Sequence, residues 1–245
     1  MAMGKGITLI SNWIGKSCMV LFIACMIPAF ATCQADYKRE REHMVTSQLK
    51  ARDIRDKATL HSMGSVPRHK FVPPELKGRA YEDGPLAIGK GQTISQPYIV
   101  AYMTQALDLK PHYKVLEVGT GSGYQAAVLS NIVDAVYSIE IVPELGETAM
   151  QRLDSLGYKN VHVRIGDGYN GWPEKAPFDA IIVTAGAEFV PGPLLMQLKD
   201  GGRMVIPVGP HHGIRKLKLF RRKGDKIKSR DLMNVRFVPL TRNMD

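Results

Sequence analysis

The stretch KVLEVGTGSGY, Lys114–Tyr124, decides the fold of this chain. A short apolar run suited to a buried strand comes first, at Val115, Leu116 and Val118. Three glycines follow at alternate positions: Gly119, Gly121 and Gly123. The residues after them, Gln125–Leu129, predict a helix. Strand, glycine turn and helix together favour a nucleotide-like ligand, because glycine lets the backbone approach closely and a helix N-terminus offers free N–H groups.

The glycine spacing narrows the class of ligand. It is G-x-G-x-G, whereas dinucleotide-binding folds use G-x-G-x-x-G. Glu117 lies two residues before the first glycine, where a pyrophosphate would meet a like charge. A cationic ligand without phosphate suits this site better, and S-adenosylmethionine carries both a sulfonium and an ammonium group. An NAD-dependent oxidoreductase is therefore disfavoured.

Strands and helices alternate after this stretch. The further predicted strands are Ala135–Ile141, Val161–Ile165, Phe178–Thr184 and Arg203–Val208. Helices are predicted at Pro143–Leu156 and around Leu194, Leu195 and Leu198, with a turn at Gly201-Gly202. This order predicts an α/β fold with a doubly wound, mostly parallel, Rossmann-like sheet. Two later runs, Leu217–Phe220 and Val235–Val238, have no long helix between them, so we expect a closing antiparallel pair.

The residues before the sheet predict helices and one long loop. Helices are expected near Val45–Leu49 and from about Asp56 to Met63. Residues 66–97 are rich in Pro and Gly yet also apolar, and long ordered loops of this kind tend to be functional. A helix follows with Pro97 in its first turn, so Ser95 is either its N-cap or a functional hydroxyl. We expect four parts. Residues 1–31 form a signal peptide or N-terminal anchor, and 32–110 hold the N-terminal helices and the long loop. Residues 111–210 form the ligand-binding α/β core, and 211–245 the C-terminal antiparallel strands.

The first 31 residues have the pattern of an export signal. Lys5 and Lys16 precede Ser17–Ala31, an apolar stretch of 15 residues that is short for a membrane span. Ala29-Phe30-Ala31 is an A-x-A cleavage site, which predicts a mature chain from Thr32 with no stable membrane span. The cleaved protein is expected to be periplasmic or secreted. An uncleaved leader would leave it cytoplasmic or anchored at the inner membrane.

The cysteines lie in or just after the leader, at Cys18, Cys25 and Cys33. The folded domain therefore has neither a disulfide nor a thiolate metal site, which suits an oxidising compartment. Cys33 stays open as a lipid attachment site. His211-His212 has no further ligand at metal-binding spacing, so these residues are interpreted as loop histidines and no metal is expected.

The net charge of +10 is concentrated in one segment. Arg215–Arg230 holds nine basic residues and one acid, Asp225. A charged run of this kind is usually a solvated face, so nucleic acid is not expected as a partner, although binding to nucleic acid or an acidic surface stays open.

Candidate binding residues stand at the ends of the predicted strands, where doubly wound sheets bind ligands. Glu140 follows Gly123 by 17 residues, where an acid can accept ribose hydroxyls. Asp167-Gly168 ends the next strand, on the side of an adenine, and Thr184–Gly186 offers small residues that leave room for an acceptor. Each feature alone could be a plain strand end or turn. The occurrence of all of them at successive strand ends is much less expected by chance than the occurrence of any one alone.

Two absences bear on the methyl acceptor. The fourth strand is followed neither by an Asp/Asn-Pro-Pro-Tyr/Phe clamp nor by a cysteine. Both absences argue against a typical base methyltransferase and indicate an acceptor that is already nucleophilic.

From about residue 42 to the C-terminus the chain resembles the protein-L-isoaspartate O-methyltransferase family. The resemblance rests on VPRHKFVP, GQTISQP, LEVGTGSGYQAA, the GDG of Gly166–Gly168, and PFDAIIVTAGA followed by LKDGGRMVIPVG. The glycine turn is shared by many methyltransferases. The segment Gly91–Pro97, which contains TISQP, is specific to this family.

The resemblance implies an activity and a set of site residues. The activity is methyl transfer from S-adenosylmethionine to the α-carboxylate of L-isoaspartyl residues in damaged proteins and peptides, followed by collapse of the ester to a succinimide. The implied active-site residue is Ser95. The implied cofactor-binding residues are Gln92, Thr93, Ile94, Glu117, Gly119, Gly121, Gly123, Glu140, Ile141, Gly166, Asp167 and Thr241.

The chemistry agrees with this implied activity. A carboxylate is ionised at neutral pH and needs no general base, so the enzyme has only to align it and exclude water. A hydroxyl at Ser95, beside the start of a helix, can hold that carboxylate, and we expect it to orient the acceptor without acting as a nucleophile. Two alternatives remain: an RNA or small-molecule methyltransferase, and a non-catalytic binder of damaged peptides.

Overall fold

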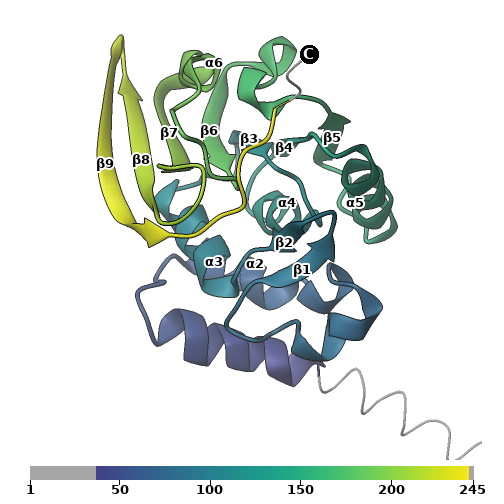
Figure 1. Cartoon of the computed structure of the whole chain (residues 1–245). Helices are drawn as coiled ribbons and strands as arrows, with labels where there is room; N and C mark the ends of the chain where they lie inside the picture. Colours follow the sequence, from purple (N-terminus) through teal and green to yellow (C-terminus); the bar gives the residue numbers. More distant parts are fainter. Residues whose placement is uncertain (1–36, 243–245) are drawn as a thin grey trace, which may run out of the picture. The chain divides into compact units, whose positions relative to one another are not determined.

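The centre of the fold is a sheet whose strands run in the order β5-β4-β3-β6-β7-β8-β9 (Figure 1). It is seen in a computed structural model, which describes residues 37–242. The strands are β3 (Lys114–Val118), β4 (Ala135–Glu140), β5 (Val161–Ile165), β6 (Phe178–Val183), β7 (Leu198–Val208), β8 (Arg215–Lys223) and β9 (Lys226–Val235). Strands β3 to β7 are parallel; β8 pairs antiparallel with β7, and β9 pairs antiparallel with β8. The predicted doubly wound sheet is confirmed.

The chain order creates a switch point beside β3. From β3 the chain adds β4 and β5 on one side, then crosses to add β6 and β7 on the other. In such sheets ligands bind at the carboxyl ends of the strands next to the switch point. Four residues of β3, from Val115 to Val118, are buried, and Leu116 and Val118 belong to a core cluster with Val183 and Leu194.

Helices cover the sheet and its lower rim in Figure 1. They are the π-helix η1 (Met44–Lys50), α2 (Lys57–Ser65), α3 (Pro97–Ala106), α4 (Tyr124–Ser130), α5 (Pro143–Ser155) and α6 (Gly192–Met196). Capping side chains and prolines determine where several of these helices begin. Asp56 caps α2 by accepting a hydrogen bond from the Thr59 N–H at 2.7 Å, and prolines occupy the first turns of α3 and α5.

The stretch 66–97 contains more regular structure than we predicted. It carries short 3-10 helices at Arg68–Lys70 and Pro74–Arg79 and a hairpin of β1 (Leu86–Gly89) and β2 (Gln92–Ile94). The hairpin could not be recognised in the sequence, because the glycines and prolines of this stretch are typical of an irregular loop. In the structure the turn places Gly89, Lys90 and Gly91 at positive φ, which glycine adopts readily. The hairpin carries Gln92, Thr93 and Ile94 to the edge of the candidate site.

Two expectations near the C-terminus are wrong in detail. The antiparallel partner of β8 is β9 at Lys226–Val235, not Val235–Val238, because the two-residue turn Gly224-Asp225 folds the strand back at once. Leu198 and Gly201-Gly202 belong to β7 instead of a helix and a turn, and the pairing with β6 is irregular there.

Residues from Arg41 onward form one compact unit. The predicted leader, its cleavage site and the three cysteines lie outside the described residues. Within residues 37–242, no helix has the length and apolar character needed to cross a bilayer.

Candidate active site

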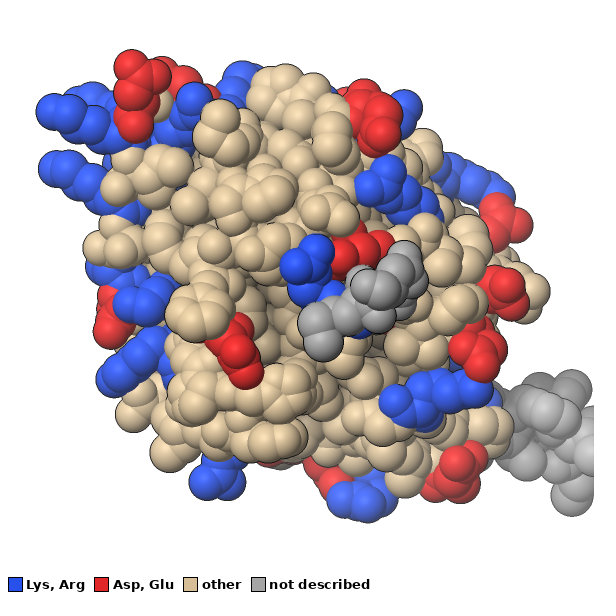
Figure 2. All heavy atoms as spheres, turned by 45° about the horizontal axis from the view of Figure 1, so that its top comes forward, with Lys and Arg blue, Asp and Glu red and all other residues tan. Residues whose placement is uncertain are grey.

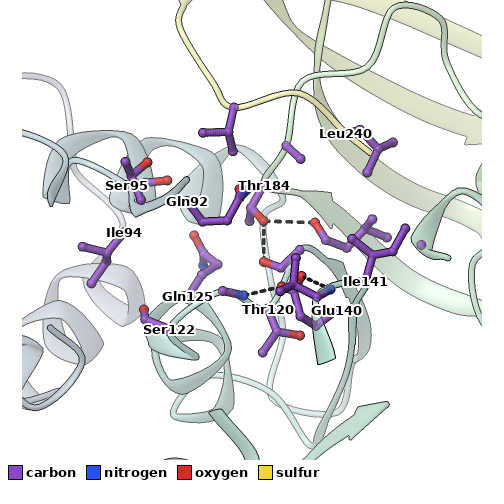
Figure 3. A pocket seen from close by; sticks show the side chains of 18 of the residues that line it. Gln92, Ile94, Ser95, Thr120, Ser122, Gln125, Glu140, Ile141, Thr184 and Leu240 are labelled. Carbon is purple, nitrogen blue, oxygen red and sulfur yellow. Dashed lines mark hydrogen bonds between the residues drawn. The ribbon is translucent and has the colours of Figure 1, made fainter. Parts of the chain in front are cut away.

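A pocket opens at the carboxyl ends of β3, β4 and β6 (Figure 3). Three segments distant in sequence close it: the β2–α3 connection, the glycine turn before α4, and residues 238–241. In Figure 3, Ile94 and Ser95 lie across the pocket from Glu140 and Ile141. The lining residues are Gln92–Ser95, Val100, Val118–Ser122, Tyr124, Gln125, Ile139–Val142, Gly168, Thr184, Ala185 and Val238–Thr241.

The glycine turn fits tightly against the end of β6. Gly119 has a φ of 98°, and a Cβ added there would collide with Oγ1 of Thr184. That hydroxyl donates to the carbonyl oxygens of Gly119 at 2.6 Å and Val118 at 3.0 Å. A side chain at position 119 would therefore displace the floor of the pocket.

Glu140 is held rigidly at the end of β4. One carboxylate oxygen accepts the Gly121 N–H at 2.7 Å, and the other accepts the Val142 N–H at 3.0 Å. Each oxygen keeps a further lone pair, so the carboxylate can also accept a pair of ligand hydroxyls. This geometry fits the ribose of S-adenosylmethionine.

Glu117 lies beneath the pocket and does not line it. One of its oxygens accepts a 2.5 Å hydrogen bond from Ser138, which is 2.6 Å from the Thr120 hydroxyl. Its other oxygen is buried without a hydrogen-bond partner in the described part of the chain. Burial raises the pKa of Glu117 to about 8, with a smaller contribution from the nearby negative charge of Glu140.

Ser95 stands between β2 and α3 and is not the helix N-cap. The cap position belongs to Gln96, because the residue before Pro97 is forced into an extended conformation. Within residues 37–242 the Ser95 hydroxyl forms no hydrogen bond, so it is free to bind a ligand. The carbonyl of Ser95, in contrast, accepts a 2.7 Å hydrogen bond from the buried guanidinium of Arg68.

A groove adjoins the pocket, and we call it the acceptor groove. It shares Thr93, Ser95, Thr184 and Val238 with the pocket. Its other lining residues are Arg52, Pro85, Gln96, Tyr98, Ile99 and Met233–Phe237. Arg52 stacks on the Tyr98 ring at 4.6 Å, and the Tyr98 hydroxyl donates to Asp53 at 2.8 Å, so this wall is polar and ordered.

The segment after β9 crosses the pocket and is tied down along its length. The Gly186 N–H donates to the Val238 carbonyl, and the Leu240 N–H donates to the Gly186 carbonyl, both at 2.8 Å. The buried Arg215 holds the Phe237 carbonyl at 2.6 Å. This segment places Leu240 and Thr241 in the pocket wall.

The structure brings most of the predicted site residues to one pocket. Gln92, Thr93, Ile94, Ser95, Gly119, Gly121, Glu140, Ile141 and Thr241 line it, whereas Glu117, Gly123, Gly166 and Asp167 do not. Gly123 is the N-cap of α4. Asp167 accepts hydrogen bonds from the Tyr169 N–H at 2.9 Å and from Arg242 at 3.2 Å, and its neighbour Gly168 lines the pocket instead.

Several lining residues were not predicted from the sequence. Thr120, Ser122 and Gln125 belong to the glycine-turn motif, so the motif itself could have indicated them. Gln125 donates to the buried Thr104 hydroxyl of α3 at 3.0 Å and thereby joins the two helices on either side of the pocket. Val238–Leu240 carry no local signal, because only the path of the chain after β9 brings them there.

The sheet and pocket define a Rossmann-like methyltransferase that uses S-adenosylmethionine. Comparison with known sequences then gives the family. The family described as protein-L-isoaspartate(D-aspartate) O-methyltransferase matches residues 39–245, and the chain belongs to it.

Relatives match over nearly their whole length. A protein-L-isoaspartate O-methyltransferase of Opitutus terrae is 59% identical over 226 residues, which cover 91% of this chain and 97% of that protein. A protein-L-isoaspartate O-methyltransferase 2 of Shewanella sediminis is 53% identical over 224 residues, 91% of this chain and 92% of the relative.

Solved structures agree. One protein-L-isoaspartate O-methyltransferase has a TM-score of 0.76 at 31% identity, covering 83% of this chain and 67% of its own. A putative enzyme of the same name from Plasmodium falciparum, solved with S-adenosyl-L-homocysteine, has a TM-score of 0.71 at 26% identity and covers 83% of this chain and 99% of its own.

Proposed function

We propose that this protein transfers a methyl group from S-adenosylmethionine to the α-carboxylate of L-isoaspartyl residues in damaged proteins. Membership of the protein-L-isoaspartate(D-aspartate) O-methyltransferase family, which matches residues 39–245, supports this proposal. The observation that carries the proposal is the position of Ser95, which lines both the cofactor pocket and the acceptor groove and whose hydroxyl has no hydrogen-bond partner in the described part of the chain. An acceptor group held at Ser95 stands where the pocket and the groove meet.

The residues of the site have three tasks. Glu140 and the glycine turn bind the cofactor, which supplies a methyl group on a sulfonium leaving group. Ser95 and the first turn of α3 orient the acceptor carboxylate, which is already ionised at neutral pH and needs no general base. The segment 238–241 and the β2–α3 connection cover the pocket and exclude water.

The orienting role of Ser95 can be separated from cofactor binding. Ser95→Ala is expected to lower kcat/KM for an isoaspartyl peptide by about 10- to 100-fold, the scale of a lost hydrogen bond to a charged group. Its Kd for S-adenosylmethionine, measured by calorimetry, is expected to stay within about twofold of wild type. Ser155→Ala, an exposed serine on α5, is the matched control. Equal losses in both quantities, or a covalent adduct trapped on Ser95, would contradict this role.

We also propose that the protein is exported. The support is the apolar stretch Ser17–Ala31 with its A-x-A site, which follows Lys5 and Lys16 and precedes the matched family region. Fractionation of cells that express the whole chain, followed by N-terminal sequencing, is expected to find a mature protein beginning at Thr32 outside the cytoplasm. A cytoplasmic protein with an intact leader would contradict export.

A further inference from the structure

The β8–β9 hairpin carries an array of positive charges on one face. Arg221 pairs with Lys228 and Lys223 pairs with Lys226 across the two strands, and directly opposed residues share a face. Arg230, opposite Leu219, lies on the same face because alternate residues of a strand point the same way. We call Arg221, Lys223, Lys226, Lys228 and Arg230 the cationic ladder. In Figure 2, lysines and arginines gather along the edge of the molecule where this hairpin lies.

The ladder side chains form no direct ion pair within residues 37–242, although two acids lie near them. The charge of Arg221 helps to lower the pKa of Asp108, and Asp200 lines a surface hollow together with Lys226 and Lys228. All five side chains are exposed, and none forms a hydrogen bond or ion pair with a described residue. Other cations of the same hairpin are paired: Lys218 with Asp231 at 2.6 Å, and Arg222 with the Leu198 carbonyl at 2.8 Å. Like charges directly opposite each other destabilise a strand pair. Cations outnumber the nearby acids, so the exposed row Lys226, Lys228 and Arg230 suits an anionic partner.

The same strand leads from the ladder to the acceptor groove. Past Arg230 the register shifts by one residue between Lys218 and Leu217. Beyond this shift Met233 lies opposite Leu217, on the ladder face, and Met233–Val238 line the groove beside Ser95. Strand β9 is also the last strand of the sheet, with no neighbour on its outer side among the described residues. About 23 Å of strand, roughly 3.3 Å per residue, separates Lys228 from Val235.

We propose that the free edge of β9 is a docking surface for an extended acidic segment of the polypeptide that is being methylated. The segment adds to the sheet edge through main-chain hydrogen bonds, and its alternate carboxylates meet Lys226, Lys228 and Arg230. This inference rests on the proposed function, because the same polypeptide presents its isoaspartyl residue at Ser95. The docking surface raises the local concentration of acidic clients and leaves the methyl transfer step unchanged.

Two pairs of synthetic peptides test the charge preference. Each peptide carries one isoaspartyl residue and, about seven residues away on its N- or C-terminal side, three glutamates at alternate positions. The partner peptide has glutamines there. At low salt, for one of the two placements of the run, the KM of the glutamate peptide is expected to be about eightfold lower than that of its glutamine partner. This is a factor of about two for each exposed ion pair, and kcat is expected to be unchanged. The difference is expected to vanish at high salt. Equal KM values in both orientations would overturn the proposal.

Variants locate the preference on the molecule. Replacing Lys226, Lys228 and Arg230 by Gln is expected to abolish it, while a short isoaspartyl peptide without the acidic run is methylated as by wild type. The matched control replaces three exposed lysines elsewhere, Lys50, Lys57 and Lys77, and is expected to keep the preference. Loss in both triple variants would indicate a general charge effect and overturn the site. If the wild-type protein failed to methylate even the short peptide, that result would instead count against the proposed function.

The strand geometry has its own test. N-methylation of the glutamates removes the N–H groups on one side of the segment, and N-methylation of the residues between them removes those on the other. One of the two peptides is expected to lose the KM advantage, and retention in both would contradict strand addition. Vesicles of anionic phospholipid and a duplex RNA are the competing occupants. Salt-sensitive binding of either to the ladder, without discrimination between the peptides, would also overturn the proposal.

Discussion

The guanidinium of Arg68 holds the carbonyl oxygen of Ser95 at 2.7 Å. The same side chain donates to the Ala80 carbonyl at 2.7 Å and lies 4.7 Å from the centre of the Tyr124 ring. It is fully buried, no carboxylate within residues 37–242 forms an ion pair with it, and burial lowers its pKa. Arg68 therefore ties the β2–α3 connection to Tyr124, the first residue of α4, and we assign it as a positioning residue for Ser95.

Replacing Arg68 separates positioning from folding. Arg68→Met leaves the buried Ala80 carbonyl and the partly buried Ser95 carbonyl without their donor and is expected to lower the free energy of unfolding by about 2–4 kcal/mol in urea denaturation. Arg68→Lys keeps the charge but cannot reach both carbonyls, so kcat/KM for the isoaspartyl peptide should fall about tenfold or more at temperatures where the variant is folded, with little change in cofactor Kd. Arg222→Met, which removes an arginine that also binds backbone carbonyls far from the site, is the control. Unchanged kcat/KM in Arg68→Lys would remove the positioning role.

The contact between Gly119 and Thr184 predicts a cofactor-binding defect. In Gly119→Ala the new methyl group meets the Thr184 hydroxyl and must shift the glycine turn, so S-adenosylmethionine should bind at least tenfold more weakly. Gly157→Ala is a matched control, since Gly157 also has a positive φ of 84° but no atom lies near its added Cβ. Both variants carry the left-handed backbone cost of about 1–2 kcal/mol, and only the first should lose affinity. Equal affinities in calorimetry would contradict the tight fit.

The buried Glu117 makes stability depend on pH in a defined direction. Its pKa is raised from 4.5 to about 8, so the folded state binds more protons than the unfolded state between these values. Glu117 therefore contributes a loss of stability as pH rises through this window, at most about 1.4 kcal/mol per pH unit. Glu117→Gln should gain stability over wild type between pH 5 and pH 8.5 in urea denaturation. Glu147→Gln, an exposed acid on α5, controls for the loss of one carboxylate. A gain independent of pH would refute this assignment.

The parts of the fold that follow local rules could be predicted from the sequence. The apolar run of β3, the three glycines and the acid at the end of β4 obey strand periodicity and turn chemistry, and they lie together as expected. The β1–β2 hairpin could not be predicted, because its turn glycines and short strands look like an irregular loop. Strand β9 was misplaced because its exposed, charged residues lack the apolar alternation of a half-buried strand.

The candidate site divides in the same way. Residues inside the motifs, such as Gly121 and Glu140, line the pocket. Residues that are brought to the pocket by distant segments of the chain carry no local sequence signal. Val238 reaches the pocket only because Gly186 pairs with the segment after β9, and Asp167 turns to Tyr169 and Arg242.

The most direct measurement follows methyl transfer from labelled S-adenosylmethionine to one peptide carrying L-isoaspartate and to its aspartyl isomer. The two peptides have the same composition and charge and differ in which carboxylate is free at Ser95. The label is expected to enter the isoaspartyl peptide as a base-labile ester and to be absent from the isomer. Equal labelling of both peptides, or labelling of neither by a protein that binds the cofactor, would contradict the proposed function.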